Sequence, residues 1–164
     1  MKKITMLFLC LGISLMVFAQ APYKHSVGVY FGSFNGITYK AFNSGSTGFQ
    51  VDAGLKLNFP RVDNHTVMAY SVEVNPNVFR QMSIPQVNGL YWLLGGGAGI
   101  GAAFHPNYSW FKLGVNAIGG IEYKFNIPLA LQLDLRPGLG FMIGNPTRLY
   151  FDWTLSFSAR YVIR

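Results

Sequence analysis

The chain has 164 residues, of which only 12% are charged while 16% are aromatic, and its mean hydropathy is positive at +0.27. Its formal net charge is +7, but the lysines and arginines are scattered and form no basic run. This composition excludes an ordinary, highly charged soluble domain, and the absence of a basic cluster gives no indication of a nucleic-acid partner.

Residues 1–19 have the features of a secretory signal peptide. Two lysines follow the initiating methionine, and a short apolar run leads to Ala19 and Ala21. The run is shorter than the ~20 residues of a membrane-spanning helix, so we expect cleavage after Ala19, with Ala21 as the alternative. The remaining residues, 20–164, form one domain by their length. They have no thiol chemistry, because the only cysteine, Cys10, lies in the signal peptide.

Apolar and polar residues alternate with a period of two throughout residues 20–164, which predicts β-strands. The segment from Leu149 to Ile163 is the clearest, because its odd positions are apolar and its even positions are mostly polar. The expected strands, in chain order, are 25–34, 37–42, 48–59, 66–79, 90–104, 110–125, 129–143 and 149–164.

Turn-forming residues separate these segments. Asn35 and Gly36 form a strong signal for a two-residue β-hairpin. Further turns are expected at 43–46, 60–65, 105–109, 126–128 and 144–148. Pro76 and Pro85 interrupt the alternation between 75 and 89, which leaves the strand boundaries open there.

Residues 90–104 are apolar throughout, and their glycines at four-residue spacing also fit a helix–helix contact. A helix would carry several glycines, each costing about 1 kcal/mol relative to alanine, and it would be too short to span a membrane. As a strand, the segment places Trp92 and Leu94 on one face and Gly95 and Gly97 on the other. We therefore expect a strand whose glycines face a narrow barrel interior.

The alternation alone would also fit a soluble, lipocalin-like barrel with its apolar face inward, so the placement of charge decides between the two. When the alternate residues of each strand are assigned to one apolar and one polar face, no charged residue falls on an apolar face. The polar faces carry Lys40, Asp52, Lys56, Glu73, Lys112, Glu122, Lys124, Asp134, Arg136, Asp152 and Arg160. A soluble exterior would need far more charge, whereas five acids and six bases suit a crowded interior in which each charge needs a partner.

Aromatic residues bracket the apolar faces at spacings of about ten residues, which correspond to roughly 25 Å of height on a tilted strand and match a lipid-facing band. These pairs are Phe49 and Phe59, Trp92 and Phe104, and Phe111 and Phe125. The predicted fold is therefore all-β: an eight-stranded antiparallel up-and-down transmembrane β-barrel whose interior holds the charge network.

Four segments resemble the small outer-membrane β-barrel proteins of Gram-negative bacteria, the group of OmpX and the OmpA transmembrane domain. They are residues 35–40, the glycine-rich 90–104, residues 120–128, and the final amphipathic stretch 159–164. The resemblance implies an outer-membrane location, contact with membrane lipid and lipopolysaccharide, and folding by the barrel-assembly machinery. One departure is the C-terminus: such proteins usually end in an aromatic residue, whereas this chain ends in Ile163 and Arg164.

Two sets of turn residues could mimic a lipid A-modifying enzyme, which would use histidine with serine or with aspartate and serine. They are His105 with Ser109, and His65 with Asp63 and Thr66. Neither set completes a catalytic motif, and the sequence has no metal-ligand spacing, phosphate loop or cofactor motif. We therefore expect neither catalysis nor a cofactor.

Arg61 and Arg148 lie in turns expected on the outer side of the membrane, where arginine could pair with lipopolysaccharide phosphates. The expected function is a structural or interaction role in the outer membrane, with a lumen filled by side chains. A narrow passive channel, a lipid A-modifying enzyme and a secreted soluble barrel are the alternatives. The sequence names no specific protein partner.

Overall fold

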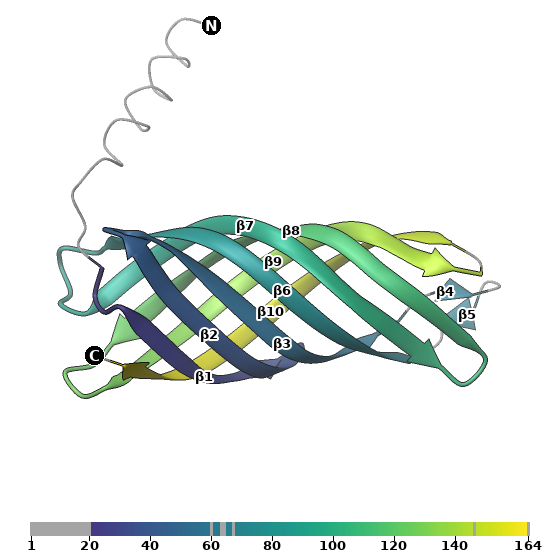
Figure 1. The fold of residues 1–164 in the computed structure, drawn as a ribbon, viewed down its shortest axis with the longest axis horizontal. Helices are drawn as coiled ribbons and strands as arrows, with labels where there is room; N and C mark the ends of the chain where they lie inside the picture. Colours follow the sequence, from purple (N-terminus) through teal and green to yellow (C-terminus); the bar gives the residue numbers. More distant parts are fainter. Residues whose placement is uncertain (1–20, 60, 63–64, 67, 146, 164) are drawn as a thin grey trace, which may run out of the picture.

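A computed structural model describes residues 21–59, 61–62, 65–66, 68–145 and 147–163. The predicted signal peptide lies outside these residues and stays a prediction. Eight strands form one closed antiparallel barrel in the ring order β1-β10-β9-β8-β7-β6-β3-β2 (Figure 1). They are β1 (His25–Gly32), β2 (Phe34–Ser44), β3 (Thr47–Asn58), β6 (Ala69–Ser83), β7 (Leu90–His105), β8 (Tyr108–Lys124), β9 (Leu129–Gly144) and β10 (Arg148–Ile163).

The barrel has two different ends. The start of β1 and the end of β10 lie together at one end, which we call the terminal end (Figure 1). At the opposite, distal end, β4 (Arg61–Val62) and β5 (His65–Thr66) pair as a small hairpin between β3 and β6. This hairpin occupies part of the segment 60–65 that was predicted as a turn.

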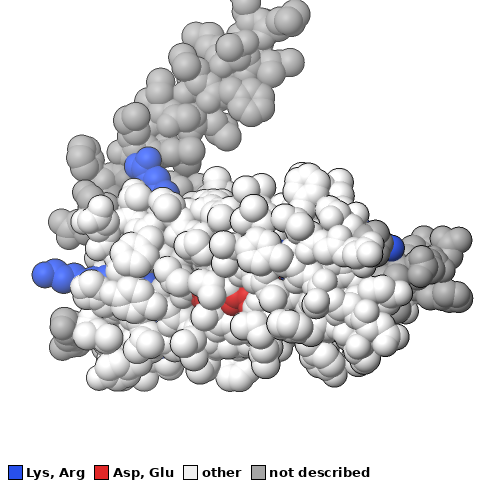
Figure 2. Space-filling model, turned by 45° about the vertical axis from the view of Figure 1, so that its right-hand side comes forward, with Lys and Arg blue, Asp and Glu red and all other residues white. Residues whose placement is uncertain are grey.

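Burial alternates along the strands, because successive side chains of a strand point to opposite faces. On β10, Ser156 and Ser158 are buried in the interior, while Leu155 and Phe157 are exposed outside. Figure 2 accordingly shows a flank that is uncharged except for acidic atoms at one place, with basic side chains near the two ends. The interior is polar and the exterior apolar, so the predicted fold class is confirmed.

The strand register fixes the shape of the barrel. A line of paired residues that leaves β10 at Arg148 returns to β10 at Ser158, a stagger of ten residues, after passing Met142, Lys112, Gly101, Glu73, Gly54, Gly36 and Tyr30. Eight strands with this stagger tilt by about 40° and enclose a space only wide enough for side chains.

The first hairpin differs from its sequence prediction. The turn lies at Gly32 and Ser33, and Asn35 and Gly36 belong to β2. Gly32 has φ of +127°, a conformation that glycine adopts without steric cost. The Asn35 side chain closes the turn, since its Nδ2 donates to the Gly32 carbonyl at 3.0 Å. The Asn-Gly signal therefore marked the wrong residues, because Asn35 stabilises the turn from the first residues of the next strand.

The glycine-rich and the proline-containing segments both form strands. Residues 90–104 lie in β7, as predicted, so the helix alternative was wrong. Within the described residues, no helix is long and apolar enough to cross a membrane. β6 continues to Ser83, beyond its predicted end at 79, because Pro76 is exposed on the outer face at a gap in the β6–β7 pairing and does not break the strand.

Leu135 provides a test of the lipid-facing exterior. It is 43% exposed, faces outward near the middle of β9, and pairs with Leu155 of β10. Leu135→Arg is expected to lower the free energy of unfolding of the lipid-embedded barrel by ~2–4 kcal/mol, because it places a charge near the bilayer midplane. Ile143→Arg, near the distal end of the same strand, is the control and should cost about 0–1 kcal/mol. Denaturant titrations in lipid vesicles measure both, and equal costs would contradict this membrane placement.

Candidate functional site in the barrel interior

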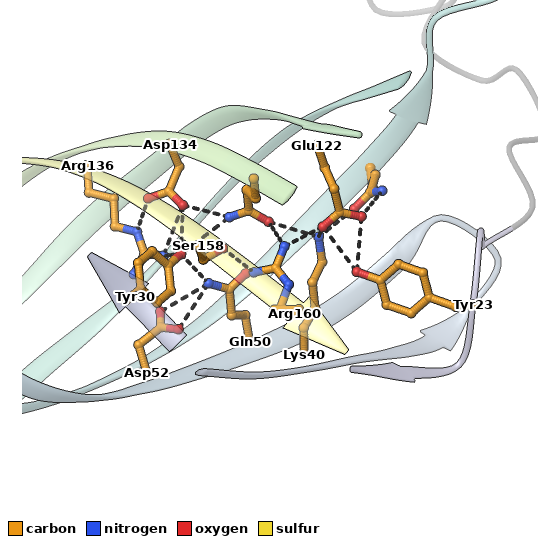
Figure 3. A network of polar contacts seen from close by, with 12 residues as sticks. Tyr23, Tyr30, Lys40, Gln50, Asp52, Glu122, Asp134, Arg136, Ser158 and Arg160 are labelled. Carbon is orange, nitrogen blue, oxygen red and sulfur yellow. Dashed lines mark hydrogen bonds and ion pairs between the residues drawn. The ribbon is translucent and has the colours of Figure 1, made fainter. Parts of the chain in front are cut away.

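Three groups of polar side chains fill the interior from the terminal to the distal end, and Figure 3 shows the first two. The terminal cluster comprises Tyr23, Lys40, Gln81, Glu122, Gln132, Ser158 and Arg160. The middle cluster comprises Tyr30, Gln50, Asp52, Asp134 and Arg136. The distal cluster comprises Lys56, Asn58, Ser71, Glu73, Lys112, Asp152 and Thr154.

Glu122 of β8 is the centre of the terminal cluster. Lys40 Nζ lies 2.8 Å from its carboxylate, Arg160 forms a second ion pair with it, and all three side chains are fully buried. Gln81 donates to Glu122 at 2.9 Å. The Tyr23 hydroxyl donates to both carboxylate oxygens, at 3.0 and 3.1 Å. Glu122 therefore neutralises cations from two other strands and holds the segment before β1 inside the barrel.

Apolar side chains seal the terminal end around this cluster. Phe79, Leu93 and Ile118 form a buried group on which Phe42 packs. The Lys40 ammonium lies 4.4 Å from the centre of the Phe79 ring, a cation–π distance. The ions of the terminal cluster therefore have little contact with solvent.

Arg136 of β9 is the centre of the middle cluster. Its guanidinium donates to Asp52 at 2.6 Å and to Asp134 at 2.7 Å. The Tyr30 hydroxyl donates to Asp134 at 2.6 Å, and Gln50 donates to Asp52 at 3.1 Å. Arginine suits this position because its planar group serves several acceptors at once.

The terminal and middle clusters compensate each other's charge. The terminal cluster has two cations and one carboxylate, whereas the middle cluster has two carboxylates and one cation. Gln132 joins them: its Nε2 donates to Asp134 at 2.6 Å, and its Oε1 accepts from Lys40 at 3.2 Å. Together the two clusters are neutral, although each alone has a net charge.

Two ion pairs form the distal cluster. Lys56 Nζ lies 2.7 Å from Asp152, and Lys112 pairs with Glu73. Asp152 is the most exposed carboxylate of the interior ion pairs, with 27% of its side chain accessible. Beyond these pairs, Trp110 belongs to an apolar cluster with Ala69, Ala103 and Met142 near the distal end.

Glycines on the inner wall make room for the larger side chains. An added Cβ at Gly114 or Gly140 would lie 2.6 or 2.8 Å from the Tyr150 hydroxyl. At Gly138 it would lie 2.7 Å from the Asp152 carboxylate. The glycines thus create space that Tyr150 and Asp152 occupy, and they do not line an open bore.

A small cavity of about 40 Å³ remains between the middle and distal clusters. Its wall includes Asn116 and Ser156, whose buried side-chain oxygens have no hydrogen-bond partner among the described residues. A polar cavity of this size is large enough for ordered water. The arrangement leaves room for water and for no larger solute at this level of the barrel.

The structure places all but one of the predicted interior charges in these clusters. The exception is Lys124, the last residue of β8, whose Nζ contacts the carbonyls of Phe125 and Ile127 in the β8–β9 loop. It reaches the loop because its strand ends there. Lys124 therefore does not belong to the charge network, contrary to the prediction.

The predicted turn residues are only partly described. Arg148 begins β10, and the Arg61 and His65 side chains and residue Asp63 lie outside the described parts. His105 and Ser109 lie on opposite faces of their strands, because Phe104 is the pairing partner of Ser109 and is exposed outside. His105 Nδ1 accepts from the Asn107 backbone at 3.3 Å. The structure does not bring His105 and Ser109 together.

Sequence reasoning missed Gln81 and Tyr23, which complete the network. Gln81 is 1% exposed at an inward position of β6, but it lies beyond the strand end predicted at 79. Tyr23 has no alternation signal, because it precedes β1 and enters the barrel only through its contacts with Ala130, Val162 and Phe42.

Solved structures share this fold. The crystal structure of neisserial surface protein A, NspA, has a TM-score of 0.62 and 12% sequence identity, over 85% of this chain and 94% of NspA. The outer membrane protein Ail of Yersinia pestis, determined in a phospholipid bilayer nanodisc, has a TM-score of 0.50 and 11% identity, over 86% and 99% of the two chains. No family model and no curated protein sequence matches the chain.

The chain thus has the fold of the small eight-stranded outer-membrane β-barrel proteins, and the predicted resemblance to that group is confirmed. In the interior, the polar groups serve mainly as partners for one another. Among the described residues, no group of three or more histidine, cysteine, aspartate or glutamate side chains could hold a metal ion.

Glu122→Gln tests how much the terminal cluster contributes to stability. It leaves Lys40 and Arg160 buried without their carboxylate, so the free energy of unfolding should fall by ~3–5 kcal/mol, and by less if water enters. Lys124→Gln, two residues further along β8, removes a charge that lies outside the network and should cost under ~1 kcal/mol. Urea unfolding in detergent micelles measures both. Equal losses would show that the network adds nothing specific.

Proposed function

We propose that this protein is an outer-membrane β-barrel that is closed to solutes and has a structural or interaction role without catalysis. The main support for this proposal is that side chains fill the lumen. Successive polar clusters and an apolar group at the terminal end occupy it. A side-chain-filled barrel offers its outer surface and its rims to other molecules, and no conducting path.

Export by the N-terminal signal peptide and folding by the barrel-assembly machinery are parts of the same proposal. With an even number of strands, both termini lie on one side of the membrane. We place them in the periplasm, so that the distal end faces outward. The membrane lipid and lipopolysaccharide around the barrel are its expected partners, and Arg61 and Arg148 lie at the end that would meet lipopolysaccharide phosphates.

Planar-bilayer recordings test closure directly. The purified monomer should insert without reproducible conductance, since the inner ion pairs and Phe79, Leu93 and Ile118 block the lumen. A large porin in the same bilayers is the positive control, and a heat-dependent shift on a gel verifies that the inserted protein is folded. Stable single-channel steps from the folded monomer would favour the narrow-channel alternative.

The absence of catalysis has its own test. His105→Ala should leave the acyl chains of lipid A unchanged, because His105 and Ser109 point to opposite faces. His65→Ala is the companion variant. Mass spectrometry of lipid A compares cells that lack the protein with cells that produce the wild type or either variant. A change in acylation that depends on either histidine would replace our proposal with the enzyme alternative.

A further inference from the structure

The wall of the barrel is much lower at β1 and β2 than elsewhere on the distal side. The register line from Arg148 reaches Tyr30 of β1 after seven steps between strands. If the distal rim had the same height all around the barrel, β1 would extend about nine residues past Tyr30. Instead, β1 ends at Gly32, only two residues past Tyr30. The β1–β2 hairpin therefore stops about 15 Å below the rest of the rim. Figure 1 shows β1 ending far short of β8, β9 and β10.

We call the resulting gap the side notch. Its floor is the β1–β2 hairpin, and its two sides are residues 149–153 of β10 and residues 57–59 of β3. Gly32 pairs with Ser156, which lies midway along β10. The side notch thus begins near the middle of the apolar band and opens through the distal half, which faces one leaflet only.

Both sides of the side notch are apolar where they face the membrane. Phe151 and Trp153 are 60% and 58% exposed, with their ring centres 5.4 Å apart, and Phe59 on the opposite side is 65% exposed. Ser33 makes the last backbone bond from the hairpin to β10, donating to Leu155 at 3.2 Å. Beyond it, among the described residues, Phe151 and Trp153 have strand partners only on the β9 side.

The side notch leads from these apolar walls into the polar interior. A recess of about 770 Å³ is lined by Phe59, Phe151 and Trp153 together with Lys56, Arg148, Tyr150 and Asp152. Lys56, Tyr150 and Asp152 also line the interior cavity, so these three side chains border both spaces. The recess therefore has one apolar side and one polar side.

Arg148 supplies this recess with a cation that pairs with none of the described carboxylates. Lys56 is paired with Asp152, but none of the ion pairs of the described residues includes Arg148. Its Nε is buried and has no hydrogen-bond partner among the described residues. The side chain as a whole is partly exposed and lines the recess, where phosphate oxygens would be strong acceptors for its accessible N–H groups.

We propose that the side notch binds a phosphorylated, acylated lipid of the outer leaflet, lipid A, with a phosphate on Arg148 and an acyl chain against Phe151 and Trp153. The inference rests on the outward-facing distal end of the proposed function. It extends that function by making a lipid a specific ligand and not only the surrounding solvent.

A peptide strand is the other kind of molecule that could fill the side notch by pairing with the edge of β10. Two strand positions are missing between β10 and β3, which leaves a gap of roughly 14 Å. One added strand would pair with one edge and leave the other open. It would also leave the Arg148 guanidinium without an anion. The lipid accounts for both the apolar walls and the cation.

Native mass spectrometry of the protein refolded in lipid-free detergent provides the test. The probes are diphosphoryl lipid A, the same lipid with its phosphates removed, and inorganic phosphate. One lipid A should remain bound, and removal of its phosphates should weaken binding about tenfold or more. Arg148→Gln should produce the same loss, whereas Arg148→Lys should retain part of the affinity. Arg80→Gln, an exposed arginine near the terminal end of β6, is the matched control and should bind as the wild type does.

The ¹H–¹⁵N signal of the Trp153 indole locates the lipid in the same samples. It should shift on lipid A addition, while that of Trp110, which is 2% exposed in the apolar cluster, should not. Equal binding by wild type and Arg148→Gln, displacement by inorganic phosphate, or a dimer that excludes lipid A would each overturn the proposal. Conductance recorded from the same protein reports separately on barrel closure, so failure of the one proposal is distinguishable from failure of the other.

Discussion

The narrow interior of an eight-stranded barrel offers its ionised side chains almost no bulk water, so they must neutralise one another. Removing a carboxylate or a guanidinium from water without a partner costs several kcal/mol. Five carboxylates and five cations share the interior, in ion pairs that run from Glu122 near one end to Asp152 near the other. This need for pairing explains why the ionised side chains of the interior gather into clusters.

The same constraint divides the protein into two functionally different halves. Toward the terminal end, the terminal and middle clusters are dry and compensate each other through Gln132. Toward the distal end, the ion pairs are less buried, a cavity remains, and the wall opens beside β10. Phe79, Leu93 and Ile118 close the terminal half. The distal half has a recess with apolar walls and Arg148, which forms no ion pair with a described carboxylate. For this reason we place the proposed lipid site in the distal half.

Local alternation was sufficient to predict the eight strands and the inward charges, because a strand's two faces are determined by neighbouring residues. The position of the first turn was not predictable in this way, since Asn35 stabilises a turn that lies before it. The pairing of Lys40 with Glu122, 82 positions apart, depends on the register of the whole ring. The low wall at β1 and β2 also depends on the register of the whole ring. Whether this hairpin reaches the rim is decided by the stagger of ten residues that accumulates around the barrel.

If the terminal and middle clusters form one neutral network, a double-mutant cycle between Lys40 and Asp52 should reveal the coupling between them. Lys40→Met removes the surplus cation of one cluster, and Asp52→Asn removes the surplus carboxylate of the other. No hydrogen bond or ion pair among the described contacts joins these two side chains directly. The double variant, whose interior is neutral again, should lose less stability than the two single variants combined, by ~1 kcal/mol or more in urea unfolding. Losses that add to within about 0.5 kcal/mol would contradict it.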